Sequence, residues 1–211
     1  MTTKPALQEI DAETQIFTPA YVAKYLAENS IGRLWVNSKP HSSFIDKLGR
    51  YVICQNPDGM ATVDSPEEIR VLDPACGTGN LLTAAFDLLY EIYLDANYRP
   101  DVIPELILSK NLFGYDIDAR AVDAAKAILI AKAHQKQSHF FRRGIEPQIR
   151  AFTEDDHPDA GLYGSLIREL DETKYHVILA NPPYMGAKQF SRVMSAWGQK
   201  DYPEPRRDCV S

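Results

Sequence analysis

Residues 69–80 read Ile69-Arg70-Val71-Leu72-Asp73-Pro74-Ala75-Cys76-Gly77-Thr78-Gly79-Asn80. The first five form a strand-like run with three aliphatic residues, and it ends in an acid. Gly77 and Gly79 allow a tight turn, and apolar residues then recur at helical spacing from Leu81 to Ile92. The stretch therefore predicts a strand, a glycine-containing loop and a helix, which is the repeating unit of a parallel sheet.

The alternation of strands and helices continues toward the C-terminus. A second strand is expected at Leu112–Asp116, followed by a helix that Asp118 can cap. Further strands are expected at 149–152 and 175–180, with a helix at 162–170 between them. The predicted fold class is therefore α/β, with a parallel sheet and crossover helices.

Unusual residues follow three of these strands. They are the loop 73–80, Asp116, and the run Asn181-Pro182-Pro183-Tyr184. Ligands bind parallel sheets at the carboxyl ends of the strands, and these ends share one edge of the sheet. We therefore expect the three groups to lie together around one ligand site.

The glycine loop does not match the common phosphate-binding motifs. Leu82 stands where G-x-G-x-x-G would need its third glycine, and no P-loop lysine follows. Asp73, just before the glycines, disfavours a phosphate and favours a cationic or hydroxyl-bearing ligand. Asp116 suits ribose hydroxyls, because Asp118 can fill the capping role and leave Asp116 free.

The run after the last strand suits a planar amino group. Pro182 and Pro183 fix φ and remove two backbone donors, so rigid carbonyl acceptors remain. Asn181 adds a side-chain carbonyl oxygen, and Tyr184 adds a flat face for stacking. Two acceptors and an aromatic ring can orient and clamp a ring that carries an amino group.

A further helix is expected after Ile16-Phe17-Thr18-Pro19. Thr18 can serve as its N-cap, and Pro19 suits the first helical position. Residues 37–66 are rich in turn formers and predict a loop or short hairpin.

The composition of the 211-residue chain excludes several classes of protein. A net charge of −6 argues against a stand-alone nucleic-acid binder. No apolar run reaches the ~18–20 residues of a membrane helix, and the N-terminus has no secretory stretch. Three scattered cysteines fit a reducing cytoplasm and predict neither a disulfide scaffold nor a metal site.

Positive charge is concentrated in one segment. From Lys126 to Arg150 there are six basic residues against one acid, Glu146. The segment is either a solvated helix face and loop or a patch that faces phosphates.

Together these motifs resemble those of class I, S-adenosylmethionine-dependent N6-adenine DNA methyltransferases in which the cofactor motifs precede the catalytic one. Phe17-Thr18-Pro19 is similar to motif X of that family, Asp73–Gly79 to motif I, Asp116 to the motif II acid and Asn181–Tyr184 to motif IV. The string Ile16–Trp35 further resembles the large methyltransferases of phage-defence BREX systems and of type IIG restriction-modification systems. The resemblance covers residues 15–190. It implies a Rossmann-like methyltransferase sheet with an N-terminal helical segment.

The resemblance also implies a site for S-adenosylmethionine. Gly77 and Gly79 would let the backbone pass the methionine part, with Asp73 near its amino group and Thr18 near its carboxylate. Asp116 would bind the ribose, and Ile117 would pack on the adenine. The implied cofactor-binding residues are Phe17, Thr18, Pro19, Asp73, Ala75, Cys76, Gly77, Gly79, Asp116, Ile117 and Asp156. Asp156 is chosen over Glu154 and Asp155 as the acid after the third strand.

The reaction that the resemblance implies needs no side-chain nucleophile. Asn181 and the Pro182 carbonyl would accept hydrogen bonds from the amino group of an adenine flipped out of duplex DNA, and Tyr184 would stack on that base. Positioning and electrostatics would supply the acceleration. The expected catalytic residues are Asn181, Pro182, Pro183 and Tyr184. Cys76 is not expected to act as a nucleophile, because it lies in the cofactor loop.

Three parts are expected along the chain. They are an N-terminal segment with the motif X helix (1–66), a partial methyltransferase core (67–190) and a short tail (191–211). The resemblance implies about seven strands and a DNA-reading region, so we expect an incomplete sheet in a truncated chain that binds S-adenosylmethionine but methylates DNA poorly alone. The expected partners are DNA and other defence-system subunits, in the cytoplasm and without a membrane.

Two alternatives stay open. The chain could be a non-catalytic module that binds cofactor or a partner protein in such a system. It could also be a protein-glutamine methyltransferase, since those enzymes share N-P-P-Y and a glutamine amide resembles the adenine amino group. The string Ile16–Trp35 argues for DNA.

Overall fold

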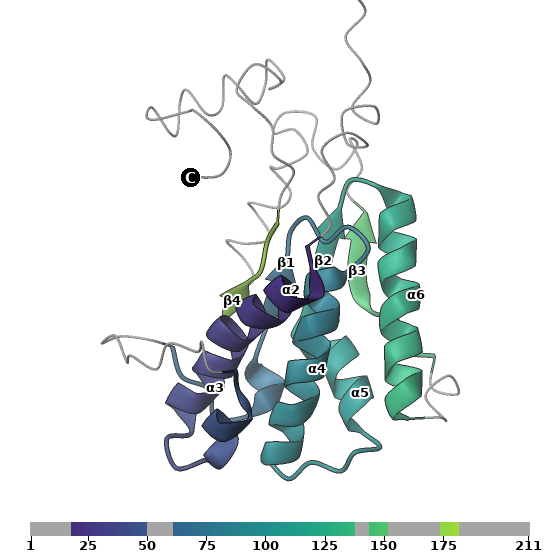
Figure 1. The fold of residues 1–211 in the computed structure, drawn as a ribbon. Helices are drawn as coiled ribbons and strands as arrows, with labels where there is room; N and C mark the ends of the chain where they lie inside the picture. The colour runs from purple at the N-terminus through teal and green to yellow at the C-terminus, as the bar shows by residue number, and fades with distance from the viewer. Residues whose placement is uncertain (1–17, 50–60, 138–143, 152–173, 182–211) are drawn as a thin grey trace, which may run out of the picture.

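The computed structural model describes residues 18–49, 61–137, 144–151 and 174–181. Four strands form its sheet, with helices packed against them (Figure 1). The strands are β1 (Val71–Asp73), β2 (Leu112–Asp116), β3 (Gln148–Ala151) and β4 (Val177–Ile178). The α-helices are α2 (Ala20–Ala27), α3 (Arg33–Ser38), α4 (Asn80–Asp95), α5 (Ile103–Leu106) and α6 (Ala119–Lys136). Two π-helical turns, η1 (Glu28–Gly32) and η4 (Ile107–Asn111), and two 3-10 turns, η2 (Ser43–Lys47) and η3 (Pro66–Glu68), complete the described elements.

The order of strands in the sheet is β3-β2-β1-β4, and every neighbouring pair is parallel. The α/β prediction with a parallel sheet is therefore confirmed. The chain builds outward from β1 through β2 to β3, whereas β4 pairs with the opposite side of β1. Such a reversal leaves a crevice at the carboxyl ends of the two strands that flank it. Here those strands are β1 and β4.

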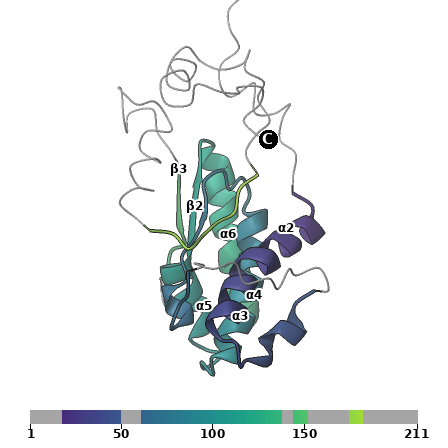
Figure 2. The same ribbon diagram turned by 90° about the vertical axis from the view of Figure 1, so that its left-hand side faces the viewer.

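Helices α4 and α6 lie on one side of the sheet, and α2 packs against α4 (Figures 1 and 2). The strands turn alternate residues toward this layer. Val71, Leu112 and Ile149 belong to the large apolar core beneath the helices, while Leu72 and Tyr115 form a smaller buried cluster on the other face. Periodicity of two along each strand thus divides the apolar residues between two cores.

The strand boundaries differ in part from those expected. β2 begins and ends as predicted, but β1 begins two residues late because Ile69 closes the η3 turn and its carbonyl accepts a bond from the Asn111 side chain (2.7 Å). β4 is confined to Val177–Ile178, although the Leu179 amide still donates to the Leu72 carbonyl (2.8 Å). β3 is shifted by one residue toward the N-terminus. The helix expected at 162–170 lies outside the described residues.

The N-terminal segment shares one apolar core with the sheet and α4. Ala27, Ile31 and Trp35 are buried in the same cluster as Leu89 of α4. The Trp35 indole also donates to the Asp95 carboxylate (2.9 Å) at the end of α4. The division at residue 66 into a segment and a core stays a prediction.

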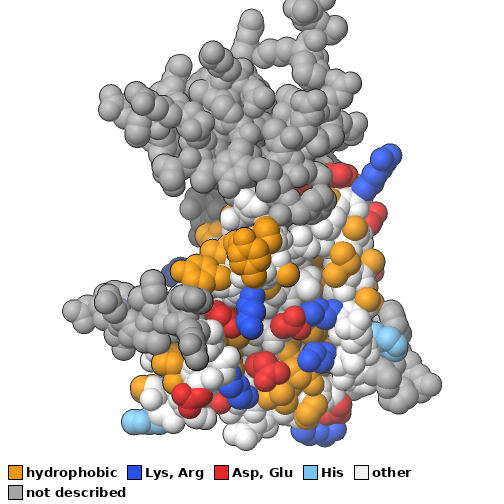
Figure 3. Space-filling view, viewed as in Figure 1, with side chains coloured by type: hydrophobic (Ala, Val, Ile, Leu, Met, Phe, Trp, Pro, Cys, Tyr) orange, Lys and Arg blue, Asp and Glu red, His pale blue; other side chains and the backbone are white. Residues whose placement is uncertain are grey.

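An aromatic surface covers the outer side of α2. Tyr21 is 76% exposed and Tyr25 is 44% exposed, and their spacing of four residues places them on one side of the helix. Figure 3 shows hydrophobic side chains gathered over α2, above a face where acidic and basic side chains are mixed.

Candidate functional site

One backbone hydrogen bond ties the glycine loop after β1 to β2, and another closes the loop on itself. The Cys76 amide donates to the Tyr115 carbonyl (2.8 Å), and the Gly79 amide donates back to the Cys76 carbonyl (2.8 Å). At the start of the loop, the Ala75 amide donates to Oδ1 of Asp73 (3.2 Å). The loop is therefore a tight structure that leads directly from the end of β1 into α4.

Asp116, at the end of β2, holds this loop from the other side. Its Oδ2 accepts a hydrogen bond from the Gly77 amide (2.6 Å), and its Oδ1 accepts one from the Asp118 amide (3.0 Å). Asp118 does cap α6, as expected, so Asp116 is not used as the cap, but both of its oxygens accept bonds from backbone amides. Each carboxylate oxygen can accept more than one bond, so Asp116 keeps capacity for a hydroxyl-bearing ligand.

Gly77 and Gly79 both have positive φ, but they differ in what surrounds them. Gly77 has φ +51°, and among the described residues no heavy atom lies within 4 Å of where a Cβ would stand. Gly79 has φ +85°, and a Cβ there would lie 3.2 Å from the Cβ of Ala125 on α6. The positive φ of Gly77 thus favours glycine there, while Gly79 also allows α6 to pack closely against the loop.

Burial sets the electrostatics at the end of β1. Removal of Asp73 from solvent raises its pKa to about 7, with the nearby Asp116 carboxylate also raising it and the Ala75 amide opposing both. Burial likewise raises the pKa of the Cys76 thiol, and the two carboxylates add to this. A thiol held in its neutral form is a poor nucleophile, in keeping with the expectation that Cys76 is not one.

Thr18 and Asn181 meet although they are far apart in the sequence. The Asn181 amide nitrogen donates to the Thr18 hydroxyl oxygen (2.9 Å), and the Asn80 side chain donates to the Thr18 carbonyl (3.4 Å). The prediction that Thr18 caps the first helix was wrong. The N-cap residue of α2 is Pro19, no side chain among the described residues caps the helix, and the Thr18 hydroxyl accepts a bond from Asn181.

The predicted site residues that are described form two linked groups at one edge of the sheet. Asp73, Ala75, Cys76, Gly77 and Gly79 are joined to Asp116, and Thr18 joins the start of α4 to Asn181. Pro19 is exposed beside Thr18, and Ile117 is half-buried after Asp116. Phe17, Asp156, Pro182, Pro183 and Tyr184 lie outside the described residues, as do Glu154 and Asp155.

Two further residues belong to this edge that sequence reasoning did not assign. Asn80 reaches Thr18, and Ala125 packs against Gly79. Nothing local in the sequence marks either contact, because each joins segments that the fold alone brings together.

Two lysines of the basic segment 126–150 make contacts that stabilise the fold. Lys132 forms an ion pair with Asp87 (2.8 Å), and the ammonium of Lys136 lies 4.4 Å from the ring centre of Tyr90. These two lysines therefore attach α6 to α4, which favours the interpretation of a helix face over that of a phosphate-facing patch.

Two kinds of feature are absent from the described residues. They contain no cluster of three His, Cys, Asp or Glu side chains suited to a metal ion. Nor does any helix among them have the length and apolar character needed to span a membrane.

A separate open groove of about 720 Å³ lies before β1, away from the glycine loop. Its lining includes Trp35, Ser42 and Asp95, and it reaches Ser65 and Tyr98. The Asp95 carboxylate accepts bonds from Trp35 and from the Ser42 hydroxyl (2.7 Å). These polar groups anchor α3 and the following turn to α4, so the groove is not the site that the strand ends form.

Comparison with known proteins supplies the family. Residues 60–197 match the family model described as MmeI, DNA-methyltransferase domain, and this range contains the glycine loop, Asp116 and Asn181. The chain belongs to this family. It is therefore a methyltransferase domain, and the resemblance inferred from its motifs is confirmed.

Two curated relatives of this methyltransferase domain are similar over most of its length. It is 38% identical over 156 residues to the adenine-specific methyltransferase BrxX of Escherichia coli O9:H4 (strain HS), a match that covers 70% of this chain and 13% of BrxX. It is 31% identical over 157 residues to the adenine-specific methyltransferase PglX of Lacticaseibacillus casei (strain Zhang), which covers 67% of this chain and 13% of PglX. The chain thus spans about 13% of the length of these relatives. Among solved structures, a DrdV–DNA complex overlaps loosely with 85% of this chain and 15% of its own, at 20% identity and a TM-score of 0.49.

Proposed function

We propose that the chain is the cofactor-binding and adenine-binding part of an S-adenosylmethionine-dependent DNA adenine-N6 methyltransferase of a restriction-modification or phage-defence system. The observation that carries this proposal is the placement of the glycine loop, Asp116 and Asn181 at the carboxyl ends of neighbouring parallel strands: Asp116 holds the glycine loop, and Thr18 links Asn181 to Asn80 at the end of that loop. The matched family and the names of BrxX and PglX, both adenine-specific methyltransferases, support the substrate. DNA as the substrate would place the protein in the cytoplasm.

The residues at this edge fit S-adenosylmethionine in their chemistry. Asp116 offers carboxylate oxygens for ribose hydroxyls, and the buried Asp73 carboxyl suits a cationic amino group. The space beside Gly77 lets a ligand approach the backbone. Thr18, Pro19, Ala75, Cys76, Gly79 and Ile117 would complete the described part of the cofactor site. When bound, S-adenosylmethionine would supply an electrophilic methyl group.

The chain's own contribution to the reaction would be orientation. The Asn181 carbonyl oxygen would accept a hydrogen bond from the adenine amino group and so direct its nitrogen toward the cofactor side of the crevice. Accepting that bond also increases electron density on the amino nitrogen, whose lone pair is otherwise delocalised into the ring. Such preorganised acceptors can supply much of an enzyme's acceleration without a covalent intermediate.

The remaining catalytic roles follow from motif IV. The Pro182 carbonyl would be the second acceptor, Pro183 would keep the run rigid, and Tyr184 would stack on the adenine. The base would have to leave the DNA duplex first, at a cost of a few kcal/mol. DNA, and other defence-system subunits beside it, would be the partners.

Two measurements on the chain test this function. Titration calorimetry with S-adenosylmethionine should give a binding signal. Transfer of a labelled methyl group should favour a duplex that contains adenine over a glutamine peptide, and Asn181→Ala should reduce that transfer at least 100-fold while cofactor affinity stays within about threefold.

Each other outcome points to a different function. Absence of cofactor binding would contradict the proposal altogether. Binding without transfer to either substrate would favour the non-catalytic module, and preferential transfer to the peptide would favour a protein-glutamine methyltransferase.

A further inference from the structure

Two asparagines from different strand ends converge on Thr18. Asn181 follows β4 and donates from Nδ2 to the Thr18 hydroxyl oxygen (2.9 Å), across 163 residues of sequence. Asn80 opens α4, directly after the glycine loop, and donates to the Thr18 carbonyl (3.4 Å), across 62 residues. Thr18 therefore bridges the loop that follows β1 and the residue that follows β4.

The hydroxyl of Thr18 is not used to begin α2. Pro19 is the N-cap residue of that helix, and its carbonyl accepts bonds from the Val22 and Ala23 amides (3.0 Å each). Since no side chain caps α2, loss of the hydroxyl would not remove a cap from the helix. The structural role of the Thr18 hydroxyl is therefore to accept the hydrogen bond from Asn181.

An asparagine amide needs such a contact to have a defined direction. Its oxygen accepts and its nitrogen donates from opposite sides of one plane, and the terminal torsion of the side chain has two broad minima. In the structure the Thr18 hydroxyl is the acceptor of the bond from Nδ2 (2.9 Å), and this bond corresponds to one of these minima. Holding the nitrogen against Thr18 therefore also sets the direction of Oδ1.

We propose that Thr18 is a positioning residue: its hydroxyl oxygen holds the Asn181 amide so that Oδ1, rather than Nδ2, faces the substrate amino group. This proposal rests on the proposed function, because it presumes that Asn181 accepts a bond from an amino group. It differs from the role in binding the methionine carboxylate that resemblance implies for Thr18. The two roles predict different effects of removing the hydroxyl.

Thr18→Val removes the hydroxyl and keeps the shape of the side chain, and Thr18→Ser keeps the hydroxyl. In the 211-residue chain, we expect Thr18→Val to lower the single-turnover rate of methyl transfer to an adenine oligonucleotide about 10- to 100-fold. The dissociation constant for S-adenosylmethionine, from calorimetry, should stay within about twofold. Thr18→Ser should restore the rate, and Thr83→Val, the same change one turn into α4, should leave it unaltered.

A second readout needs no activity. The side-chain NH2 signals of Asn181, assigned by their loss in Asn181→Asp, should exchange with water faster in Thr18→Val than in the unaltered chain or in Thr18→Ser. This comparison uses cofactor-free protein, so it reports the contact itself.

Three results would overturn the proposal. They are a normal transfer rate in Thr18→Val, unchanged exchange of the Asn181 amide, and a loss of cofactor affinity as large as the loss of rate, which would assign Thr18 to the cofactor instead. If the unaltered chain transfers no methyl group, the proposed function fails and the catalytic part of this proposal fails with it. Faster amide exchange in Thr18→Val would then still support the Thr18–Asn181 contact.

Discussion

Asp73 stands at the end of β1 with only 1% of its surface exposed. Its pKa is raised from an ordinary value of 3.8 to about 7, first by burial and then by the Asp116 carboxylate. The folded chain therefore keeps the Asp73 proton to a higher pH than the unfolded chain does. The stability that this group contributes is fully present below about pH 4 and is lost as the pH rises to about 7.

Asp73→Asn should remove this pH dependence, because an amide keeps an oxygen for the Ala75 amide but does not titrate. We expect the free energy of unfolding of the unaltered chain to fall relative to that of the variant between pH 4 and pH 8, by an amount on the order of 2–4 kcal/mol. Urea denaturation across that pH range measures the difference in unfolding free energy between the two proteins. The contributions of the other titrating groups are common to both and cancel. A difference that does not vary with pH would show that Asp73 ionises normally.

The two loop glycines allow a matched comparison at the same scale. Gly79→Ala should cost about 2 kcal/mol or more of stability, because its φ is positive and the new Cβ would press on Ala125 (3.2 Å). Gly77→Ala should cost about 1 kcal/mol, since only the positive φ opposes it, but it should weaken S-adenosylmethionine binding at least tenfold by filling the open side of the loop. Thermal unfolding and calorimetry separate the two effects. Equal cofactor affinity in Gly77→Ala would remove that side of the loop from the site.

At the scale of elements, the position of α6 depends both on a local cap and on packing against the glycine loop. Asp118 is its N-cap, and the Asp118 carboxylate accepts a bond from the Arg120 amide (2.9 Å). The buried face of the helix carries Ala125 and Leu129, and Ala125 is the residue against which Gly79 packs. The cap determines where the helix begins, and the small side chain determines how closely it approaches the glycine loop.

Asp118→Ala should destabilise the chain by about 1 kcal/mol, as expected for loss of a single cap. Asp123→Ala, on the exposed side of the same helix, is the matched control and should change stability by less than about 0.5 kcal/mol. Chemical denaturation of both variants makes the measurement. Equal effects would mean that helix-wide charge, rather than the cap, is responsible.

At the scale of the whole molecule, the predicted site and a buried polar network lie at opposite ends of the strands. The predicted site occupies the carboxyl ends of the strands, whereas a buried polar network occupies the amino ends of β1 and β2. Asn111, at the end of the η4 turn, donates to the carbonyls of Pro66 (2.8 Å) and Ile69 (2.7 Å) and accepts from the Tyr93 hydroxyl (2.9 Å). One fully buried side chain thereby joins α4 to the segments that lead into two strands.

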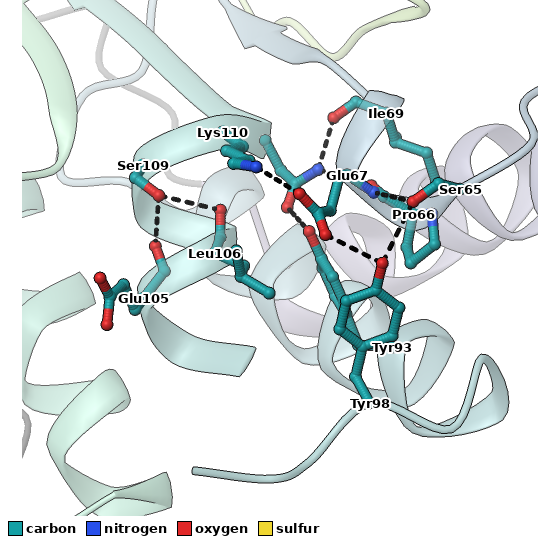
Figure 4. A network of polar contacts seen from close by, with 11 residues as sticks. Ser65, Pro66, Glu67, Ile69, Tyr93, Tyr98, Glu105, Leu106, Ser109 and Lys110 are labelled. Atoms are coloured by element: carbon teal, nitrogen blue, oxygen red, sulfur yellow. Dashed lines mark hydrogen bonds and ion pairs between the residues drawn. The ribbon is translucent and has the colours of Figure 1, made fainter. Parts of the chain in front are cut away.

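A second set of contacts surrounds this network (Figure 4). The Glu67 carboxylate accepts from the Tyr98 hydroxyl (2.9 Å) and pairs with Lys110, and the bond to Lys110 lowers the Glu67 pKa. Ser109, on the outer side of η4, donates to the Glu105 carbonyl (2.7 Å). These outer contacts are partly exposed to water, so we expect them to contribute less than the bonds of Asn111.

Asn111→Ala should therefore destabilise the chain by about 3 kcal/mol or more, because it leaves two carbonyls and a hydroxyl buried without their bonds. Tyr93→Phe should cost about 1–2 kcal/mol, since it leaves a single acceptor unsatisfied. Ser109→Ala, nearby but exposed, should change stability by less than about 0.5 kcal/mol. Urea denaturation ranks the three. Near-equal values for Asn111→Ala and Ser109→Ala would contradict a central role for the buried network.

Several features could be predicted from the sequence because they depend on neighbouring residues. The apolar run that ends at Asp116 predicted β2, the spacing after Asp118 predicted α6 and its cap, and the order of these units predicted a parallel sheet. The placement of unusual residues after strands predicted that they would share an edge, because parallel strands end on the same side. That inference needed no contact between the residues themselves.

Other features depend on contacts between residues that are far apart in the sequence. The position of Thr18 before Pro19 is typical of a helix N-cap. In the fold, however, Asn181 from the other end of the chain donates to the Thr18 hydroxyl oxygen. Asp118 caps α6 as the sequence predicted, but only the fold shows that the loop after β1 places the Gly77 amide on Asp116. The π-helical turn that carries Asn111 to the entry of β1 has no marker in its own residues.

The amino-acid sequence by itself determined the class of the fold and the family, and it predicted the edge of the sheet at which a ligand would bind, since these follow from periodicity and from short motifs. The tertiary structure alone decided which atom faces which within that edge. A hydrogen bond depends on distances of a few tenths of an ångström, and such distances exist only after the strands have set the loops beside one another.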